Sequence, residues 1–318
     1  MKDLLFVMYM GGPDSLDAIR PFLFNLFTDR DIINFKIGEL PQRLLANIIS
    51  KSRSKKVIPD YEKMGGKSPQ LDYLRSLLRK VEHIYTEDYG GKLDTRIGMC
   101  YYHPFIEDTF ADIDPEEYKN IYVTTMYPQY SYTTSGACFK RFYNCLRMRP
   151  IKHFETINFW HLNRRYNECL IFRIRNAAET LGTHLKNIHL FFSAHSLPEY
   201  TQAEGDYYVY QIKEQVDYLV KAVSPAGYSL GFQSRTGPMK WLGPETRDEL
   251  NNIAEKGVDN IVVVPISFVS DHIETLIELD EQYISALKTK GVNIVRIESL
   301  NDGDDFAKAF VDIIRNGG

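Results

Sequence analysis

The sequence predicts an α/β fold of two similar Rossmann-like domains, each built from a four-stranded parallel sheet flanked by helices. Short apolar runs alternate with longer amphipathic runs along the 318 residues, a pattern typical of parallel strands joined by helical crossovers. Some of the short runs, such as IVVVPISF at 261–268, are apolar almost throughout. Such runs suit strands that are buried on both faces of a sheet.

Eight strands and ten helices are expected, and four strands per half of the chain indicate the two domains. The expected strands lie near 4–10, 96–101, 120–126, 153–159, 187–194, 227–233, 259–268 and 291–297. The expected helices lie near 15–27, 40–52, 69–86, 104–112, 137–147, 163–182, 208–222, 244–256, 272–289 and 304–315. With a hinge at Arg149-Pro150, the domains are 1–150 and 151–300, and residues 301–318 form a C-terminal helix expected to pack on the first domain.

The composition is that of a globular protein and excludes several other classes. Hydrophobic residues make up 44% and charged residues 25%, which excludes disorder over most of the length. The formal net charge of −4 argues against a nucleic-acid partner. The apolar run at 4–10 is too short to span a membrane and lacks the features of a signal peptide, so a cytoplasmic protein is expected. The 13% of aromatic residues fit either a ring-rich core or a pocket for a flat apolar ligand.

Several familiar motifs are incomplete or missing. GGKS at 65–68 resembles the end of a phosphate-binding loop, but Tyr61 stands where that motif needs its first glycine. No G-x-G-x-x-G follows an expected strand, and no G-x-S-x-G occurs. None of the four cysteines belongs to a C-x-x-C pair, so the sequence gives no support for zinc or iron–sulfur ligation.

The unusual residues gather where expected strands end. Ligands of open parallel sheets bind beyond the C-terminal ends of the strands. In this chain those positions are residues 9–13, 127–132, 193–198 and 268–274. His195 directly follows the expected strand NIHLFFSA, and it shares a face with Ser193 if the strand extends to both residues. A single histidine at a strand end is more often structural than catalytic, but this position makes His195 a candidate base.

A group of acidic residues follows the strand near 259–268. If a helix begins here, Asp271, Glu274, Glu278 and Glu281 are spaced by 3, 4 and 3 residues, which places four carboxylates on one face. The structural alternative is that Asp271 caps the helix, with Glu274 as its partner three residues on. Spacing alone leaves both readings open.

Six segments, in the right order, resemble the ferrochelatase family. FSAHSLPE at 192–199 is similar to the signature around the family's active-site histidine, and SDHIETLIELDEQY at 270–283 to the signature that supplies a facing glutamate. The other four segments are residues 9–33, 61–69, 126–136 and 232–246. The resemblance covers nearly the whole chain and implies the chelatase fold, with an active-site cleft between the two domains.

The resemblance implies a metal chelatase of the lyase class, which inserts Fe(II) into protoporphyrin IX to make protohaem in the terminal step of haem biosynthesis. Insertion requires the loss of two pyrrole protons, and His195 would accept them from a distorted macrocycle. A histidine pKa of about 6.5 suits that work near neutral pH. Glu274 would face His195, and both are candidate metal ligands. Asp271, His272 and Glu278 would extend a path for protons or metal.

The resemblance also implies contacts with the porphyrin. The implied residues are Met10, Arg53, Lys56, Tyr130, Ser131 and Trp241. Arg53 and Lys56 are suited to the porphyrin propionates, although a basic run such as KSRSKK at 51–56 is more often simply solvated. Two positions depart from the family. Cys100 stands where many relatives have arginine, and Tyr9 where many have asparagine.

No cofactor is expected beyond the substrate Fe(II). Animal-type relatives end in a cysteine-bearing extension that holds a 2Fe–2S cluster, whereas no cysteine follows Cys169 here, so no iron–sulfur cluster is expected. The expected partners are the porphyrin and Fe(II), together with an iron or haem carrier and peripheral contact with a membrane. The alternatives are a coproporphyrin III ferrochelatase and a non-catalytic porphyrin- or haem-binding protein. The second alternative is the weaker one, because a pure binder does not need a base opposite an acid.

Overall fold

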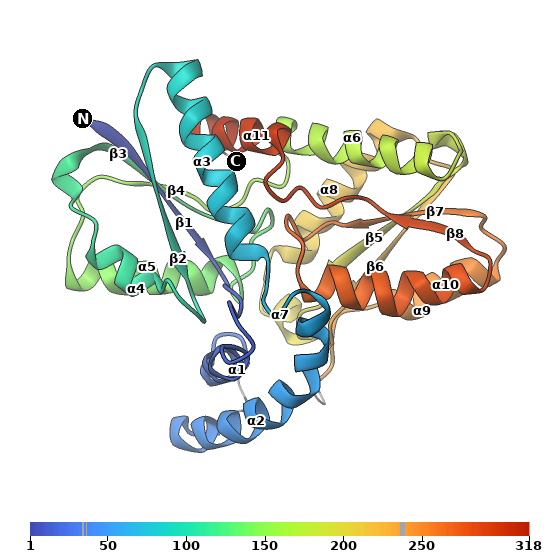
Figure 1. Ribbon diagram of the computed structural model, residues 1–318, viewed down its shortest axis with the longest axis horizontal. Coiled ribbons are helices and arrows are strands. Elements are labelled where there is room, and N and C mark those ends of the chain that lie inside the picture. Colours follow the sequence, from blue (N-terminus) through green and yellow to red (C-terminus); the bar gives the residue numbers. More distant parts are fainter. Residues whose placement is uncertain (34, 36, 236–238, 318) are drawn as a thin grey trace. The chain divides into compact units, whose positions relative to one another are not determined.

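The computed structural model describes residues 1–33, 35, 37–235 and 239–317. The chain divides into two compact units, Met1–Trp160 with Phe310–Gly318 and His161–Ala309. Each unit contains one four-stranded sheet whose strands are all parallel (Figure 1). The predicted fold class, two four-stranded parallel sheets flanked by helices, is confirmed.

The first sheet has the strand order β2-β1-β3-β4. Its strands are β1 (Lys2–Tyr9), β2 (Leu93–Met99), β3 (Tyr118–Thr125) and β4 (Glu155–Ile157). The helices of this unit are α1 (Ile19–Thr28), α2 (Glu39–Lys63), α3 (Gln70–Tyr89), α4 (Ile106–Ala111) and α5 (Ser135–Met148), with a 3₁₀ turn at Pro115–Glu117. The apolar run in β1 is fully buried from Leu4 to Met8, as expected for a central strand of a parallel sheet.

Helices α1 and α2 pack on each other beyond the C-terminal end of β1 (Figure 1). Phe27, Ile33 and Ala46 form a small apolar cluster of their own. Gln42 of α2 is buried in it, and its Nε2 donates to the carbonyl oxygens of Phe27 (3.3 Å) and Ile33 (2.7 Å). One face of α2 is therefore fixed by α1 and the segment that follows it.

The second sheet repeats the order of the first, as β6-β5-β7-β8. Its strands are β5 (His189–His195), β6 (Gly227–Gln233), β7 (Asn260–Pro265) and β8 (Asn293–Arg296). The helices that follow Trp160 are α6 (Arg164–Thr180), α7 (Glu199–Ala203), α8 (Tyr208–Val223), α9 (Thr246–Glu255), a π-helix (Glu274–Ile284), α10 (Ser285–Thr289) and α11 (Asp304–Asn316), with a 3₁₀ turn at Leu185–Asn187. The central strand β5 is buried from Leu190 to Ala194 and ends at His195, which pairs with Gln233 of β6.

The division of the chain lies between Trp160 and His161, later than the boundary expected at residue 150. The reason is that β4, which follows residue 150, pairs with β3 and completes the first sheet. Trp160 belongs to the same unit, because its ring packs edge-on against Phe310 at a centroid distance of 5.9 Å.

The C-terminal helix α11 was expected to pack on the first domain. The division of the chain falls within this helix, since residues 304–309 belong to the second unit and residues 310–316 to the first. Near its start, Asp305 pairs with Arg173 of α6 in the second unit. Near its end, the guanidinium of Arg315 lies 4.5 Å from the ring centroid of Tyr89 in the first unit.

Three further elements differ from the sequence prediction. Helix α2 continues to Lys63, past the expected end near 52, and contains Pro59 within its length. The short helix α7 was not predicted. The helix expected at 272–289 begins as a π-helix at Glu274. Within the described ranges, no helix is long and apolar enough to cross a membrane.

Candidate active site

The central feature of the second unit is a contact between His195 and Glu274. His195 is the last residue of β5, and Glu274 is the first residue of the π-helix. Their side chains meet with 2.9 Å between Nδ1 of the imidazole and Oε2 of the carboxylate. The two side chains are 30% and 26% exposed, so both are partly shielded from water and still open to a ligand.

The environment favours the ionised form of this pair. Burial alone would lower the pKa of His195, but the charge and the hydrogen bond of Glu274 outweigh it and raise the pKa above its usual value. Burial alone would raise the pKa of Glu274, but the two imidazoles of His195 and His272 hold it well below its usual range. Glu274 is therefore a carboxylate near neutral pH and accepts a hydrogen bond from Nδ1–H of His195. When the imidazole is neutral, its lone pair is then on Nε2.

A second imidazole completes the group. Nε2 of His272 lies 3.8 Å from Oε2 of Glu274, and its Nδ1 lies 3.0 Å from the carbonyl oxygen of Ser270. Because a carbonyl can only accept, Nδ1 of His272 carries a proton and the Nε2 side faces the carboxylate. Phe268 contacts both histidine rings, with centroid distances of 6.0 Å to His195 and 4.6 Å to His272.

The backbone of His195 is held on both sides. Its N–H donates to Oγ of Ser267 at 2.8 Å, and its carbonyl accepts from the hydroxyl of Tyr208 at 2.9 Å. Ser267 follows β7 and Tyr208 begins α8, so two elements fix the end of β5. Held in this way, the imidazole needs little reorganisation to meet a ligand.

Asp271 belongs to a separate network. Its carboxylate accepts from the hydroxyls of Ser299 (2.7 Å) and Thr275 (3.1 Å) and from Nδ2 of Asn301 (2.9 Å), and it pairs with Arg296 at 3.1 Å. Burial would raise the pKa of Asp271, but Arg296 and the hydrogen bonds hold it below its usual value. Asp271 therefore anchors the segment before the π-helix.

Glu278 is held by a third set of contacts, at the end of β6. It accepts from the N–H (2.9 Å) and hydroxyl (2.6 Å) of Ser234 and from the hydroxyl of Tyr283 (2.6 Å). Gln233, next to Ser234, donates from Nε2 to the backbone carbonyl of Glu274 at 3.1 Å. Its Oε1 accepts from Ser193 on β5 at 2.6 Å. Gln233 thus ties the first turn of the π-helix to the strand that carries His195.

The four acidic residues do not share one face as the spacing suggested. Asp271 precedes the helix, which begins at Glu274, so the rule for helical spacing does not apply to it. Glu281 is exposed, whereas Glu274 and Glu278 both meet residues of the sheet. The capping alternative is also wrong, because Ile273 precedes the helix and no side chain caps it.

The residues implied for porphyrin binding lie in several places. Met10 follows β1 and packs partly buried against the first core. Tyr130 and Ser131 lie between β3 and α5, where Ser131 is fully buried and shares a hydrogen bond with Thr133 at 2.9 Å. The burial of Ser131 fits a turn residue better than a ligand contact. Arg53 and Lys56 are exposed on α2.

The backbone around Trp241 is hydrogen-bonded to the segment that follows His195. It forms an antiparallel bridge with Pro198, and the flanking Glu199 N–H donates to the carbonyl of Lys240 at 2.9 Å. Leu242 N–H donates to the carbonyl of Leu197, also at 2.9 Å. Trp241 is therefore held within one short ribbon with the residues after β5.

No three His, Cys, Asp or Glu side chains of the described residues are arranged to hold a metal ion. In this arrangement, Nδ1 of His195 is engaged by Glu274. A metal that is a substrate must be released after it binds, and a ready-made cage would oppose that step.

The family model described as ferrochelatase matches residues 2–317. The chain belongs to the ferrochelatase family. It is 35% identical over 319 residues to the ferrochelatase of Aquifex aeolicus, with 99% of each chain covered. It is 36% identical over 328 residues to the ferrochelatase of Sulfurihydrogenibium sp., covering 97% of this chain and 96% of that one.

Solved structures of chelatases share the fold. The sirohydrochlorin chelatase SirB from Bacillus subtilis subspecies spizizenii, in complex with cobalt, is 10% identical and covers 99% of this chain and 94% of its own, with a TM-score of 0.57. SirB from Bacillus subtilis with Fe3+ reaches a TM-score of 0.60 at 10% identity, covering 99% and 95%. Membership of the ferrochelatase family makes the protein a metal chelatase that inserts metal into a porphyrin in haem biosynthesis.

Several residues of the candidate site were missed from the sequence. Ser267 and Phe268 end an apolar run at the carboxyl edge of the sheet, and that position was a signal for both. Gln233 and Ser234 lie in a segment that resembles the family, yet nothing in their spacing pairs them with the π-helix. Tyr208 opens an ordinary amphipathic helix, and no local pattern marks it.

Proposed function

We propose that this ferrochelatase inserts Fe(II) into protoporphyrin IX to make protohaem, the terminal step of haem biosynthesis, with His195 as the acceptor of the pyrrole protons. The observation that carries the proposal is the 2.9 Å contact between Nδ1 of His195 and Oε2 of Glu274. A carboxylate on one ring nitrogen orients the imidazole and makes the other nitrogen the base.

The reaction needs a base because both pyrrole N–H protons must leave as the metal enters. In the proposed step, Nε2 of His195 takes a proton from a macrocycle bent so that its nitrogen lone pairs are exposed. The imidazolium that results is stabilised by Glu274, whose pKa is held low by its neighbours. Each proton must then leave the imidazolium before the next can be accepted.

The proposed metal contacts are His195 and Glu274, with His272 beside them. His272 presents its Nε2 side to Glu274, so it can share a proton or the metal with that carboxylate. The resemblance to the family also implies Asp271 and Glu278 as part of a path for protons or metal. Their hydrogen bonds to Ser299, Asn301, Ser234 and Tyr283 favour a different role, in which they fix the two ends of the segment that carries Glu274.

The preference for protoporphyrin IX rests on the side chains proposed to bind the porphyrin. Met10 and Trp241 offer apolar surface, and Arg53 and Lys56 offer two cations, which matches a ring with two propionates and two vinyl groups. Coproporphyrin III, the alternative substrate, has four propionates. Cys100, where many relatives carry arginine, is buried and offers no charge to a further propionate.

Anaerobic turnover of the purified protein with Fe(II) tests the proposal. The two porphyrins are supplied separately, and metal insertion is followed by the change in absorption. We expect faster turnover of protoporphyrin IX. Faster turnover of coproporphyrin III would support the same reaction with the alternative substrate. Tight binding of either porphyrin without metal insertion would support the non-catalytic alternative.

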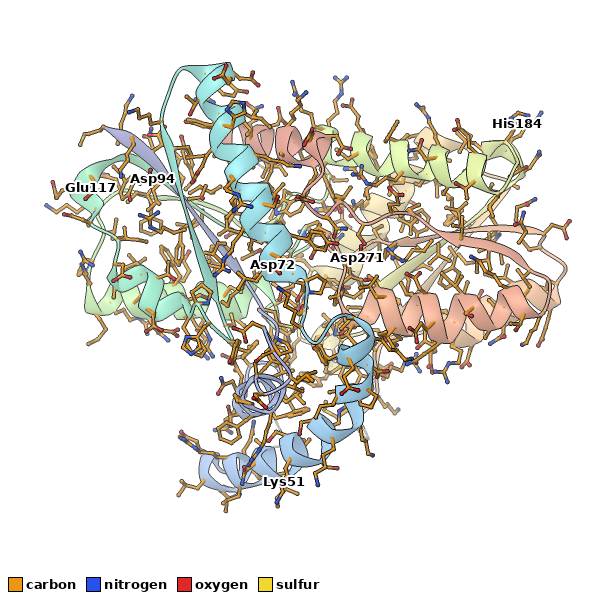
Figure 2. The ribbon with its side chains drawn as sticks, viewed as in Figure 1. Lys51, Asp72, Asp94, Glu117, His184 and Asp271 are labelled. Atoms are coloured by element: carbon orange, nitrogen blue, oxygen red, sulfur yellow. The ribbon has the colours of Figure 1, made fainter. Side chains whose placement is uncertain are left out.

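We also propose that helix α2 brings the protein to the surface of an anionic membrane. Leu40, Leu44 and Ile48 are 76%, 68% and 66% exposed and lie one turn apart on one face of the helix. Lys51 and Lys55 continue that face at spacings of 3 and 4 residues, and Figure 2 shows Lys51 on the side of α2 away from α1. Residues 39–58 hold five Lys and Arg against one Glu. An exposed apolar stripe with basic flanks is the pattern of helices that lie on anionic lipid.

Sedimentation with lipid vesicles tests this surface. We expect binding to vesicles that contain phosphatidylglycerol, weaker binding to pure phosphatidylcholine, and loss of binding at high salt. The double variant Leu44→Glu with Ile48→Glu should lose binding. Phe172→Glu, which places a charge at an exposed apolar position of α6, should retain it. Equal binding by both variants would contradict the assignment to α2.

A further inference from the structure

Two cysteine thiols of the first unit face each other in its core. The sulfur atoms of Cys100 and Cys138 are 3.3 Å apart, although 38 positions separate them in the sequence. Both side chains are buried, and both cysteines are free thiols. This contact is not part of the group around His195, which lies in the other unit.

The backbone holds both cysteines in place. Cys100 follows β2 directly, and its N–H donates to the carbonyl of Tyr9 at 3.0 Å. Cys138 lies in the first turn of α5, where its N–H bonds to the carbonyl of Thr134 at 3.2 Å. One sulfur atom is therefore held at the end of a strand and the other in a helix. No loop has to become ordered to bring them together.

The surroundings explain why the thiols are stable in the reduced form. Phe139 and Phe142 belong to the same apolar cluster. Burial raises the pKa of the Cys138 thiol, and the guanidinium of Arg141 opposes that effect only in part. Reaction with an oxidant thus requires a small molecule and a brief opening, because the thiolate is the reactive form.

We infer that Cys100 and Cys138 are a redox modification site, at which hydrogen peroxide converts the two thiols into a reversible disulfide. One thiolate attacks the peroxide, which breaks the O–O bond, releases water and leaves a sulfenic acid. The second thiol displaces the hydroxyl group as water and forms the S–S bond. Two thiols and one peroxide give one disulfide and two molecules of water, and a dithiol restores the thiols by exchange.

The expectation that this protein meets peroxide rests on the proposed function. Fe(II) reacts with oxygen, and the reduced oxygen species that result include peroxide, so a protein that handles Fe(II) meets this oxidant. A paired thiol reacts further to the disulfide, which a dithiol can reverse, whereas an unpaired one can proceed to sulfinic acid. The chemistry at Cys100 and Cys138 leaves His195 and Glu274 untouched.

Peptide mapping of the oxidised protein tests the inference without relying on chelation. The full-length folded protein is treated with hydrogen peroxide in the presence of a chelator, unfolded, alkylated and digested. We expect one cross-linked peptide pair containing Cys100 and Cys138, with Cys145 and Cys169 alkylated. Dithiothreitol should return all four cysteines to alkylation. Recovery of Cys100 and Cys138 as alkylated thiols after oxidation would overturn the inference, whatever the activity of the enzyme.

Matched variants identify the pair. Cys138→Ser and Cys100→Ala should each abolish the cross-link, and circular dichroism should show that each variant is folded. Cys145→Ser, on the same helix as Cys138, should retain the cross-link. A disulfide that persists in Cys138→Ser, or one that is lost in Cys145→Ser, would contradict the assignment.

Thermal unfolding supplies a second measurement. A native-compatible cross-link constrains the unfolded chain, so the oxidised protein should have a higher Tm than the reduced protein. The difference should be absent in Cys138→Ser. An oxidised protein with an equal or lower Tm would show that the disulfide does not fit the native fold and would overturn the inference.

Discussion

Oε2 of Glu274 and Nδ1 of His195 meet at 2.9 Å, although 79 positions separate the two residues in the sequence. The contact joins the carboxyl end of β5 to the first residue of the π-helix. It leaves Nε2 of the imidazole as the nitrogen that can accept a proton, and this relationship is the basis of the first two predictions.

Replacement of His195 by alanine should lower turnover by about 10²–10⁴-fold, the usual contribution of a general base. Binding of the porphyrin should persist, because the apolar and cationic contacts proposed for it remain. The measurement pairs anaerobic chelation rates with fluorescence titration of the porphyrin. His189→Ala, at the other end of the same strand, is the matched control and should turn over normally. Normal turnover in His195→Ala would remove His195 from the mechanism.

The pH dependence of kcat/KM should follow His195. The imidazole accepts protons only when it is neutral, and its pKa is raised above the usual value. Turnover should therefore fall as the pH drops through a midpoint above about 6.5. In Glu274→Gln the carboxylate charge is lost while the burial remains, so the midpoint should move to lower pH and the maximal rate should fall. Glu281→Gln, an exposed position of the same helix, should leave the profile unchanged. An unshifted midpoint in Glu274→Gln would show that another group sets the profile.

The strands and most helices could be predicted from the sequence, because their signals are local. The apolar run that becomes β5 and the amphipathic run that becomes α8 each carry their own periodicity. The π-helix has no such signal, since it differs from an α-helix in hydrogen bonds that run from i to i+5. A helix was expected over 272–289, but neither its type nor its start at Glu274 could be read.

Only part of the candidate site could be predicted, because some of its contacts join residues that are distant in the chain. Resemblance to a family singled out His195 and Glu274, and the structure brings them together. The roles of Asp271 and Glu278 depend on partners that are distant in the chain, such as Arg296 and Ser234. Residue type and spacing do not show which donor each carboxylate contacts. A carboxylate that anchors a segment therefore cannot be distinguished in the sequence from one that carries protons.

The contact of Ser234 with Glu278 should contribute to stability despite a backbone cost. Ser234 has a φ of +67°, in the left-handed region that costs a non-glycine residue roughly 1 kcal/mol. Ser234→Gly relieves that cost but removes a hydroxyl that donates to a carboxylate, a bond that contributes about 1.5–3 kcal/mol. The variant should therefore have a lower free energy of unfolding.

Ser224→Gly is the matched control for this prediction. Ser224 has a φ of +51° at the end of α8 and is exposed, with no carboxylate contact among the hydrogen bonds described for it. Glycine there should raise the free energy of unfolding by roughly 1 kcal/mol. Urea denaturation measures both variants. Similar stabilisation in the two would mean that the Ser234 hydroxyl contributes little.

Arg296 should be more important for folding than for chemistry. It pairs with Asp271 at 3.1 Å and with Asp280 at 2.7 Å, and its side chain is 9% exposed. Arg296→Met leaves two carboxylates without their cation, and loss of one partner of a buried pair costs about 3–5 kcal/mol. The free energy of unfolding should fall by an amount of that order, measured by urea denaturation.

The variant Asp271→Asn distinguishes between two roles of Asp271, as a structural anchor or as a carrier of protons. The amide keeps the shape of Asp271 and an oxygen for the hydroxyls of Ser299 and Thr275, but it loses the charge that faces Arg296. If Asp271 is an anchor, the variant should unfold more easily while its turnover per folded molecule stays within a few-fold of the parent. If Asp271 carries protons from His195, turnover should collapse with little change in stability. Chelation rates measured well below the Tm, beside the unfolding curve, decide between the two roles.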